Sequence, residues 1–168
     1  MRRWSTKESE ASSLLVVGGG RRVDLIRAYR HQLTDVEAHW LAIAAMLANA
    51  RTLKEQLPEA AWRDHVRDMR ASAGTLAILN PVTFMRYDDP QHPLGALPAN
   101  WSVTSDSIAA RAAELAEADE LVVLKSASPP AADRSEELAA AGYVDAYFSA
   151  AVRTVAHVRF VNFRATNL

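Results

Sequence analysis

The 168-residue chain contains no cysteine, and this absence excludes disulfides, thiolate nucleophiles and cysteine-ligated metal sites. It also has no apolar run near the roughly 20 residues that a membrane-spanning helix needs. An excess of one charge is lacking too, because 19 basic and 20 acidic residues leave a net charge of −1. Neither nucleic acid nor a membrane surface is therefore expected as a partner. The five histidines show no metal-ligand spacing, so no metal site is predicted, and the cysteine-free composition suits a cytoplasmic protein.

Apolar runs of strand length alternate with helical patterns along the chain. Strands are predicted at 14–17, 75–80, 121–125 and 157–163. The run at 14–17 is continuously apolar, which is typical of a buried strand in a parallel sheet. We therefore predict a doubly wound α/β domain with a largely parallel sheet, in which residues 1–168 form a single domain. Residues 1–13 are expected to be a tail or a residual helix.

The clearest predicted helix covers residues 33–50. Thr34 is its expected N-cap, and Glu37 three residues later completes a capping box. Its alanine-rich and almost uncharged interior predicts burial on most sides. Further helices are predicted from Arg22 onward, over 58–74 with Gly74 as the C-cap, from 104, within 128–142 and over 143–156. Prolines and a glycine make residues 82–103 look irregular.

Three consecutive glycines, Gly18, Gly19 and Gly20, follow the first apolar run and precede a helix. Ligands of parallel sheets bind beyond the carboxyl ends of the strands, and a glycine turn before a helix leaves backbone N–H groups open to an anion. The alternative is that the glycines only permit a tight turn and close helix packing. Asp24 and Arg27 lie one helical turn apart behind this turn, either facing a ligand or simply solvated.

A second polar cluster joins Thr104, Ser105, Asp106 and Ser107 at the start of a helix. One such residue is enough for N-capping, so some of these side chains are candidates for ligand contact. Asp106 could then face a lysine, a metal or backbone amides. His39 lies within the helix 33–50, where it is either a hydrogen-bonded core residue or a contact of the site.

Two stretches around these features, LLVVGGGRRVDLIRAYRHQLTDVEAHWLAIAAM and LPANWSVTSDSIAARAAELAEADELVVLKS, resemble the amino acid kinase superfamily. Within it they are most similar to the uridylate-kinase-like group that contains the aminomethylfuran phosphate kinases of methanofuran biosynthesis. The resemblance implies a three-layer α/β/α sandwich that transfers the γ-phosphoryl group of ATP, with Mg²⁺, to a small-molecule acceptor. A homodimer is the expected assembly.

The resemblance also implies roles for individual residues. It makes Asp106 the catalytic residue that organises lysines around the transferred phosphoryl group. It places Lys125 and Ser126, at the end of a predicted strand, near ATP. The residues expected to bind the acceptor are Gly18, Gly19, Gly20, Asp24, His39, Thr104, Ser105 and Ser107.

The superfamily's usual first strand with its Lys-x-Gly-Gly-Ser motif is not found in this sequence. The chain is therefore expected to correspond to the family without its first strand and most of its first helix. Two interpretations follow. Either the start site lies too far downstream and the longer protein is the kinase, or the chain is a non-catalytic relative that binds a phosphorylated metabolite or a nucleotide.

Overall fold

The computed structural model describes residues 11–69, 74–131 and 134–165. It divides into two compact units, one within Ser9–Trp101 and the other within Ser102–Leu168. The sequence analysis expected a single domain over residues 1–168, and this expectation stays a prediction. The tail or helix predicted for residues 1–13 lies largely outside the described residues.

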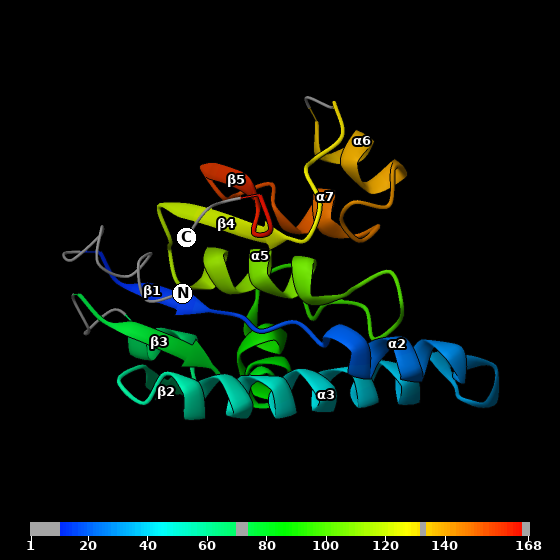
Figure 1. The fold of residues 1–168 in the computed structure, drawn as a ribbon, viewed down its shortest axis with the longest axis horizontal. Coiled ribbons are helices and arrows are strands. Elements are labelled where there is room, and N and C mark those ends of the chain that lie inside the picture. Colours follow the sequence, from blue (N-terminus) through cyan, green and yellow to red (C-terminus); the bar gives the residue numbers. More distant parts are fainter. Residues whose placement is uncertain (1–10, 70–73, 132–133, 166–168) are drawn as a thin grey trace. The chain divides into compact units, whose positions relative to one another are not determined.

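The first unit contains a parallel three-stranded sheet (Figure 1). Its strands are β1 (Ser13–Leu15), β2 (Ala61–Arg63) and β3 (Leu76–Leu79), with β3 in the centre. Leu15 and Trp62 both pair with Ile78. The carboxyl ends of the three strands therefore lie at one edge of the sheet, where the glycine turn also begins. Ala77, Ile78 and Leu79 are completely or almost completely buried, as expected for a central strand.

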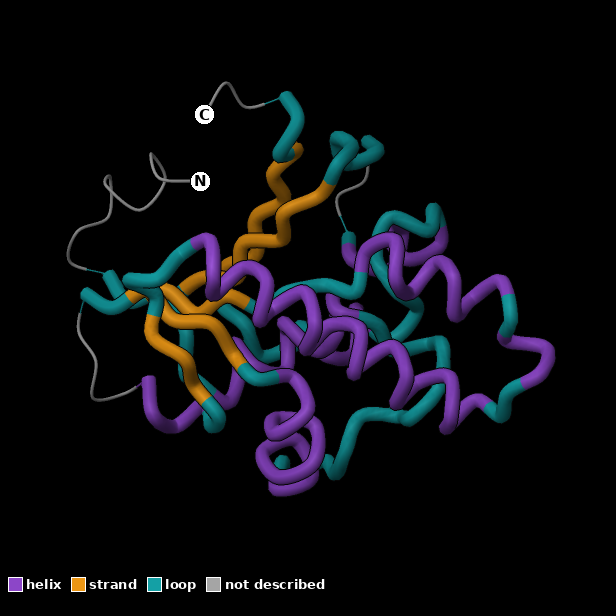
Figure 2. Tube along the Cα trace, turned by 60° about the horizontal axis from the view of Figure 1, so that its bottom comes forward, coloured by secondary structure: helices purple, strands orange, loops and turns teal. Residues whose placement is uncertain are grey.

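Two helices follow the glycine turn and pack against each other (Figures 1 and 2). They are α2 (Gly20–Ala28) and α3 (Asp35–Gln56), with the short 3₁₀ helix η1 (Arg30–Gln32) between them. The predicted capping box at the start of α3 is confirmed: the Glu37 N–H donates to Thr34 Oγ1, and the Thr34 N–H donates to the Glu37 carboxylate.

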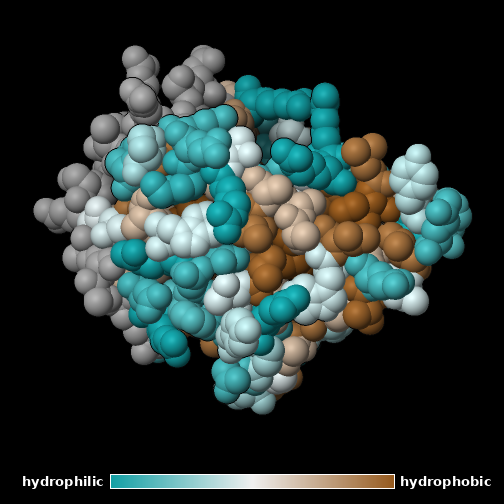
Figure 3. Space-filling model, turned by 90° about the horizontal axis from the view of Figure 1, so that it is seen from below, coloured by the Kyte–Doolittle hydropathy of each residue, from teal (hydrophilic) through white to brown (hydrophobic). Residues whose placement is uncertain are grey.

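Burial of α3 on most sides was expected, and this expectation is wrong. Ile43, Met46 and Ala50 are buried, whereas Val36 and Leu41 are exposed. Figure 3, seen from the side of this helix, shows apolar surface there. The exposed apolar side chains explain the error, because Val36 and Leu41 look like core residues in the sequence.

The helix predicted over 58–74 is also wrong. This segment contains β2 and the 3₁₀ helix η2 (Val66–Met69) instead. Ala61–Arg63 form a strand because they pair with one side of the central strand β3. Gly74 does have the left-handed φ of +67° that suits a C-cap, but residues 70–73 lie outside the described part.

Residues 81–91 are helical, although 82–103 was predicted to be irregular. The chain forms α4 (Pro81–Thr83), the π-helical turn η3 (Phe84–Asp88) and the 3₁₀ helix η4 (Asp89–Gln91). Asn80 caps this segment by accepting from the N–H groups of Val82 and Thr83. Proline at the first helical position favours the start of a helix. The segment is therefore helical in spite of Pro90 near its end.

The second unit contains α5 (Ser105–Leu115), β4 (Glu120–Lys125), α6 (Ser135–Ala140), α7 (Phe148–Ala151) and β5 (His157–Asn162). Strands β4 and β5 pair in parallel along their whole length (Figure 1). Leu121, Val123, Leu138 and Phe148 are central to its core. Of the helix predicted over 143–156 only α7 is observed, because residues 143–147 form bends and a turn and residues 152–154 form another turn.

The α/β class and the parallel pairing of the strands are thus confirmed, with the described strands divided between two sheets. Over the described ranges, no helix combines the length and the apolarity needed to cross a membrane.

Candidate functional site

The start of α5 is organised by a carboxylate that the sequence analysis did not identify. Asp145 accepts hydrogen bonds from the backbone N–H of Thr104 (2.9 Å) and of Ser107 (3.0 Å). It also accepts from both hydroxyls, Thr104 Oγ1 at 2.9 Å and Ser107 Oγ at short range. The side chain of the N-cap residue Thr104 makes no capping bond of its own. Asp145 therefore caps the helix from 41 residues downstream.

This arrangement engages two of the four polar side chains that were predicted to face a ligand. Ser107 is fully buried, and the Thr104 hydroxyl donates to Asp145. Ser105, the first residue of α5, is partly exposed. Contact of these three residues with an acceptor stays a prediction.

Asp106 forms an ion pair with Lys125, the last residue of β4. Lys125 Nζ lies 2.6 Å from Asp106 Oδ2, and the two side chains are only 22% and 14% exposed. Burial raises the pKa of the Asp106 carboxyl, while the hydrogen bond and the charge of Lys125 lower it and the charge of Asp145 raises it again. The aspartate thus faces a lysine, which is one of the three partners that its sequence context left open.

The loop after β4 is tied to its surroundings by polar contacts. Tyr143 Oη donates to the Ala127 carbonyl at 3.0 Å, and Asn162 Nδ2 donates to Ser128 Oγ at 3.0 Å. Lys125 Nζ lies 5.6 Å from the centre of the Tyr143 ring, within the range of a cation–π contact. Ser126 is exposed in this loop. A cation and a hydroxyl thus stand together at the carboxyl end of a strand.

In the first unit, Asn49 of α3 holds the glycine turn. Its Nδ2 donates to the carbonyls of Gly18 (2.9 Å) and Gly19 (2.8 Å), and its Oδ1 accepts from Arg22 Nε at 2.8 Å. Asn49 was not predicted, although a lone asparagine in an alanine-rich helix is a signal that could have identified it. The side chain fixes the carbonyls of the turn on one side.

Two of the three glycines have a local structural reason. A Cβ on Gly19 would lie 2.0 Å from Val23 Cγ2, so the residue must be glycine for α2 to pack as it does. Gly20 has a φ of +53°, which favours glycine. Close packing thus explains the glycine at position 19, and backbone conformation explains the glycine at position 20. The predicted contact of the turn with an acceptor stays a prediction.

Asp24 and His39 differ in their surroundings. Asp24 is exposed and pairs with Arg27 at 3.3 Å, as expected of a solvated surface pair. His39 is only 4% exposed and stacks edge-on against Trp40. Its Nε2 has no hydrogen-bond partner. Burial lowers the pKa of His39, while a hydrogen bond with the Asn100 backbone raises it, so burial favours a neutral imidazole.

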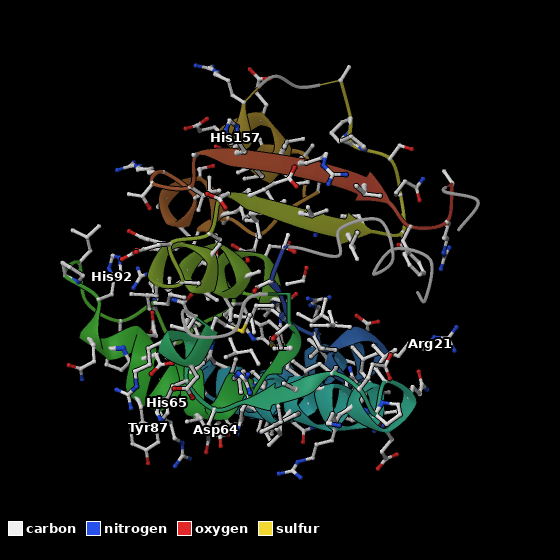
Figure 4. All side chains as sticks on the ribbon, turned by 90° about the vertical axis from the view of Figure 1, so that its left-hand side faces the viewer. Arg21, Asp64, His65, Tyr87, His92 and His157 are labelled. Carbon is white, nitrogen blue, oxygen red and sulfur yellow. The ribbon has the colours of Figure 1, made fainter. Side chains whose placement is uncertain are left out.

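A further polar group lies beyond β2 and was also missed. His65 Nδ1 lies 2.7 Å from Asp88 Oδ1, and the Val66 N–H donates to Asp88 Oδ2 at 2.8 Å. Asp64 accepts from Asn80 Nδ2 at 2.8 Å. Figure 4 shows Asp64 and His65 in the same part of the first unit, well separated from Arg21 of α2. These contacts link the ends of β2 and β3 to the π-helical turn.

The predicted site residues thus fall into two sets. Thr104, Ser105, Asp106, Ser107, Lys125 and Ser126 lie in the second unit, where Asp106 and Lys125 are in direct contact. Gly18, Gly19, Gly20, Asp24 and His39 lie in the first unit. The described residues contain no group of three or more acidic, histidine or cysteine side chains that could hold a metal ion.

The fold is similar to that of a solved structure. The crystal structure of uridylate kinase from Archaeoglobus fulgidus matches with a TM-score of 0.63, over 95% of this chain and 81% of that chain. The two sequences are 17% identical, so the likeness shows a common fold. No protein-family model and no curated protein matches the sequence. The chain therefore has the α/β fold of a uridylate kinase, which agrees with the amino acid kinase fold expected from its sequence.

Proposed function

We propose that the chain is an ATP-dependent phosphotransferase that acts on a small-molecule acceptor. The observation that carries this proposal is the contact between Lys125 and Asp106, a half-buried ion pair at the carboxyl end of a parallel strand. Ligands of such sheets bind at this end of the strands. The similarity of the fold to a uridylate kinase supports the proposal.

Phosphoryl transfer requires mainly positioning and neutralisation of the charge on the transferred group. An ammonium group has three N–H donors. Lys125 uses one of them on Asp106 and keeps the others for phosphate oxygens. Asp106 fixes the position of this cation through a hydrogen bond of 2.6 Å.

ATP with Mg²⁺ supplies the phosphoryl group and the charge that balances it. Mg²⁺ usually binds through one or two carboxylates together with the substrate phosphates. Lys125 and Ser126 are the residues that would contact the nucleotide. Kinship with the aminomethylfuran phosphate kinase group, a homodimer and a cytoplasmic location are parts of the same proposal.

Calorimetric titration with MgATP and an assay of ADP release test the proposal. We expect MgATP to bind, and we expect Asp106→Asn and Lys125→Met each to lower ADP release by about 10²-fold, the usual effect of removing one preorganised charge contact. Asp119→Asn and Arg153→Met are matched controls, because both residues are exposed in the same unit, and they should leave the rate unchanged.

The possible outcomes distinguish a kinase from a non-catalytic relative that binds a nucleotide. Binding of MgATP without ADP release, at any acceptor concentration tried, would replace the kinase by a nucleotide-binding relative. Absence of both binding and release would refute the proposal for this chain. Equal rates in the control and site variants would remove the Asp106–Lys125 pair from the mechanism.

A further inference from the structure

The turn Tyr143–Tyr147 contacts both members of the Asp106–Lys125 pair. Tyr143, at its start, lies with its ring 5.6 Å from Lys125 Nζ and anchors the loop after β4 through Ala127. Asp145, in its middle, caps the helix turn that carries Asp106. One short segment thus reaches the lysine from one side and the aspartate from the other.

Asp145 is fully engaged in this task. Its carboxylate accepts from five donors, namely the N–H and hydroxyl of Thr104, the N–H and hydroxyl of Ser107, and the N–H of Tyr147. The Tyr147 N–H also donates to the Ser102 carbonyl at 3.0 Å. Charge-assisted hydrogen bonds of this kind are about twice as strong as neutral ones. The turn and the start of α5 therefore form one connected network.

The link is reciprocal. The Asp145 side chain bonds the residues on either side of Asp106, and a hydrogen bond from the Asp145 backbone acts on the Asp106 carboxyl. A capping box works in the same way over three residues, whereas this one joins segments 41 residues apart. In this arrangement Lys125 Nζ donates to Asp106 Oδ2 at 2.6 Å.

We infer that Asp145 is a positioning residue of the candidate site: it holds the first turn of α5 so that Asp106 keeps its contact with Lys125. This inference rests on the proposed function in treating that pair as the chemical centre. Asp145 touches neither Lys125 nor, in the proposal, the substrate. It acts only through Asp106.

The charges around Asp106 provide a test that needs no substrate. The charged groups that act on its carboxyl are Lys125 of β4, which lowers the pKa, and Asp145 of the turn, which raises it. Asp145→Asn removes a negative charge and would by that effect alone lower the pKa of Asp106. If Asp145 also holds Asp106 against Lys125, the substitution breaks the ion pair and the pKa of Asp106 rises instead. The two roles thus predict shifts of opposite sign.

The experiment is a carboxyl ¹³C NMR titration of Asp106 in the wild-type chain and in Asp145→Asn. Lys125→Met provides the reference for an unpaired Asp106, and Asp119→Asn is the control for loss of an exposed charge. We expect the titration midpoint in Asp145→Asn to move up toward that of Lys125→Met. A midpoint that falls or stays unchanged would overturn the inference. If Asp145→Asn does not fold, Ser107→Ala removes one of the five bonds and should move the midpoint up by a smaller amount, and no upward shift there would be equally decisive.

Activity then separates this inference from the proposed function. If the wild-type chain releases ADP, Asp145→Asn should lower the rate, while Asp106→Asn/Asp145→Asn should be no slower than Asp106→Asn alone. Such non-additivity is expected of residues that act as one unit. Losses that multiply would show that Asp145 acts independently of Asp106. If the wild-type chain releases no ADP, the kinase proposal fails, and the NMR titration still decides whether Asp145 positions Asp106.

Discussion

The substitution Gly19→Ala tests whether the glycine turn is shaped by packing. Gly19 has φ −75° and ψ −22°, which every residue adopts, so the backbone gives no reason for a glycine. The added Cβ would lie 2.0 Å from Val23 Cγ2 and 3.0 Å from Val23 Cβ. Valine in a helix has one strongly preferred χ1 rotamer, so Val23 has no easy way to turn aside.

The expected loss follows from two opposing effects. Overpacking of this kind costs about 1–3 kcal/mol, and the lower entropy of the unfolded alanine chain offsets about 0.4–1 kcal/mol of it. Gly19→Ala should therefore lower the free energy of unfolding by about 1–2 kcal/mol. In the Val23→Ala background the 2.0 Å clash with Cγ2 is gone, whereas the Cβ of residue 23 stays 3.0 Å from the added Cβ, so the same substitution should cost clearly less than in the wild type.

Urea unfolding of the four proteins of this double-mutant cycle, followed by circular dichroism, measures both values. Gly20→Ala is the control, because its φ of +53° makes alanine unfavourable by about 1–2 kcal/mol whether or not Val23 is present. An equal loss from Gly19→Ala in both backgrounds would refute the packing argument.

Two further predictions concern the same unit. Asn49→Asp replaces the donor to the Gly18 and Gly19 carbonyls by an acceptor, so it should lower the free energy of urea unfolding by about 1–3 kcal/mol, and a similar loss from the exposed control Gln91→Glu would contradict this reason. Hydrogen bonds from Thr34 lower the pKa of Glu37 from its ordinary value of 4.5. The contribution of the Glu37 carboxylate to the free energy of unfolding is therefore complete above pH 4.5 and is lost as the pH falls through the lower pKa of the folded state. The difference in stability between the wild type and Glu37→Gln should therefore shrink on acidification, and a difference that stays constant in acid would rule out this linkage.

The elements that the sequence predicted well are those whose signals are local. The capping box of Thr34 and Glu37 lies within one helical turn, and β3 is a continuous apolar run of four residues. Both depend on neighbours in sequence, so no knowledge of the rest of the fold was needed. The parallel pairing followed from the alternation of helices and strands.

The elements that were missed depend on distant partners. Ala61–Arg63 are too few to show a period, and they become a strand because β3 offers free backbone groups on that side. Asp145 looked like one acid within a helix, and only its contact with residues near 104 shows its role. Asn49 and the His65–Asp88 pair likewise link segments that are far apart in sequence.

The polar segment from Thr104 to Ser107 shows how this distinction bears on function. Four polar residues in a row suggested a surface facing a ligand, but the two hydroxyls of Thr104 and Ser107 are directed to Asp145. Long-range capping therefore explains much of the polarity. It leaves Asp106 as the side chain of that segment that pairs with a cation, in a contact of 2.6 Å. The two aspartates thus differ in their partners: Asp145 accepts from donors of the fold, whereas Asp106 contacts Lys125, the cation that the proposed function assigns to a phosphate.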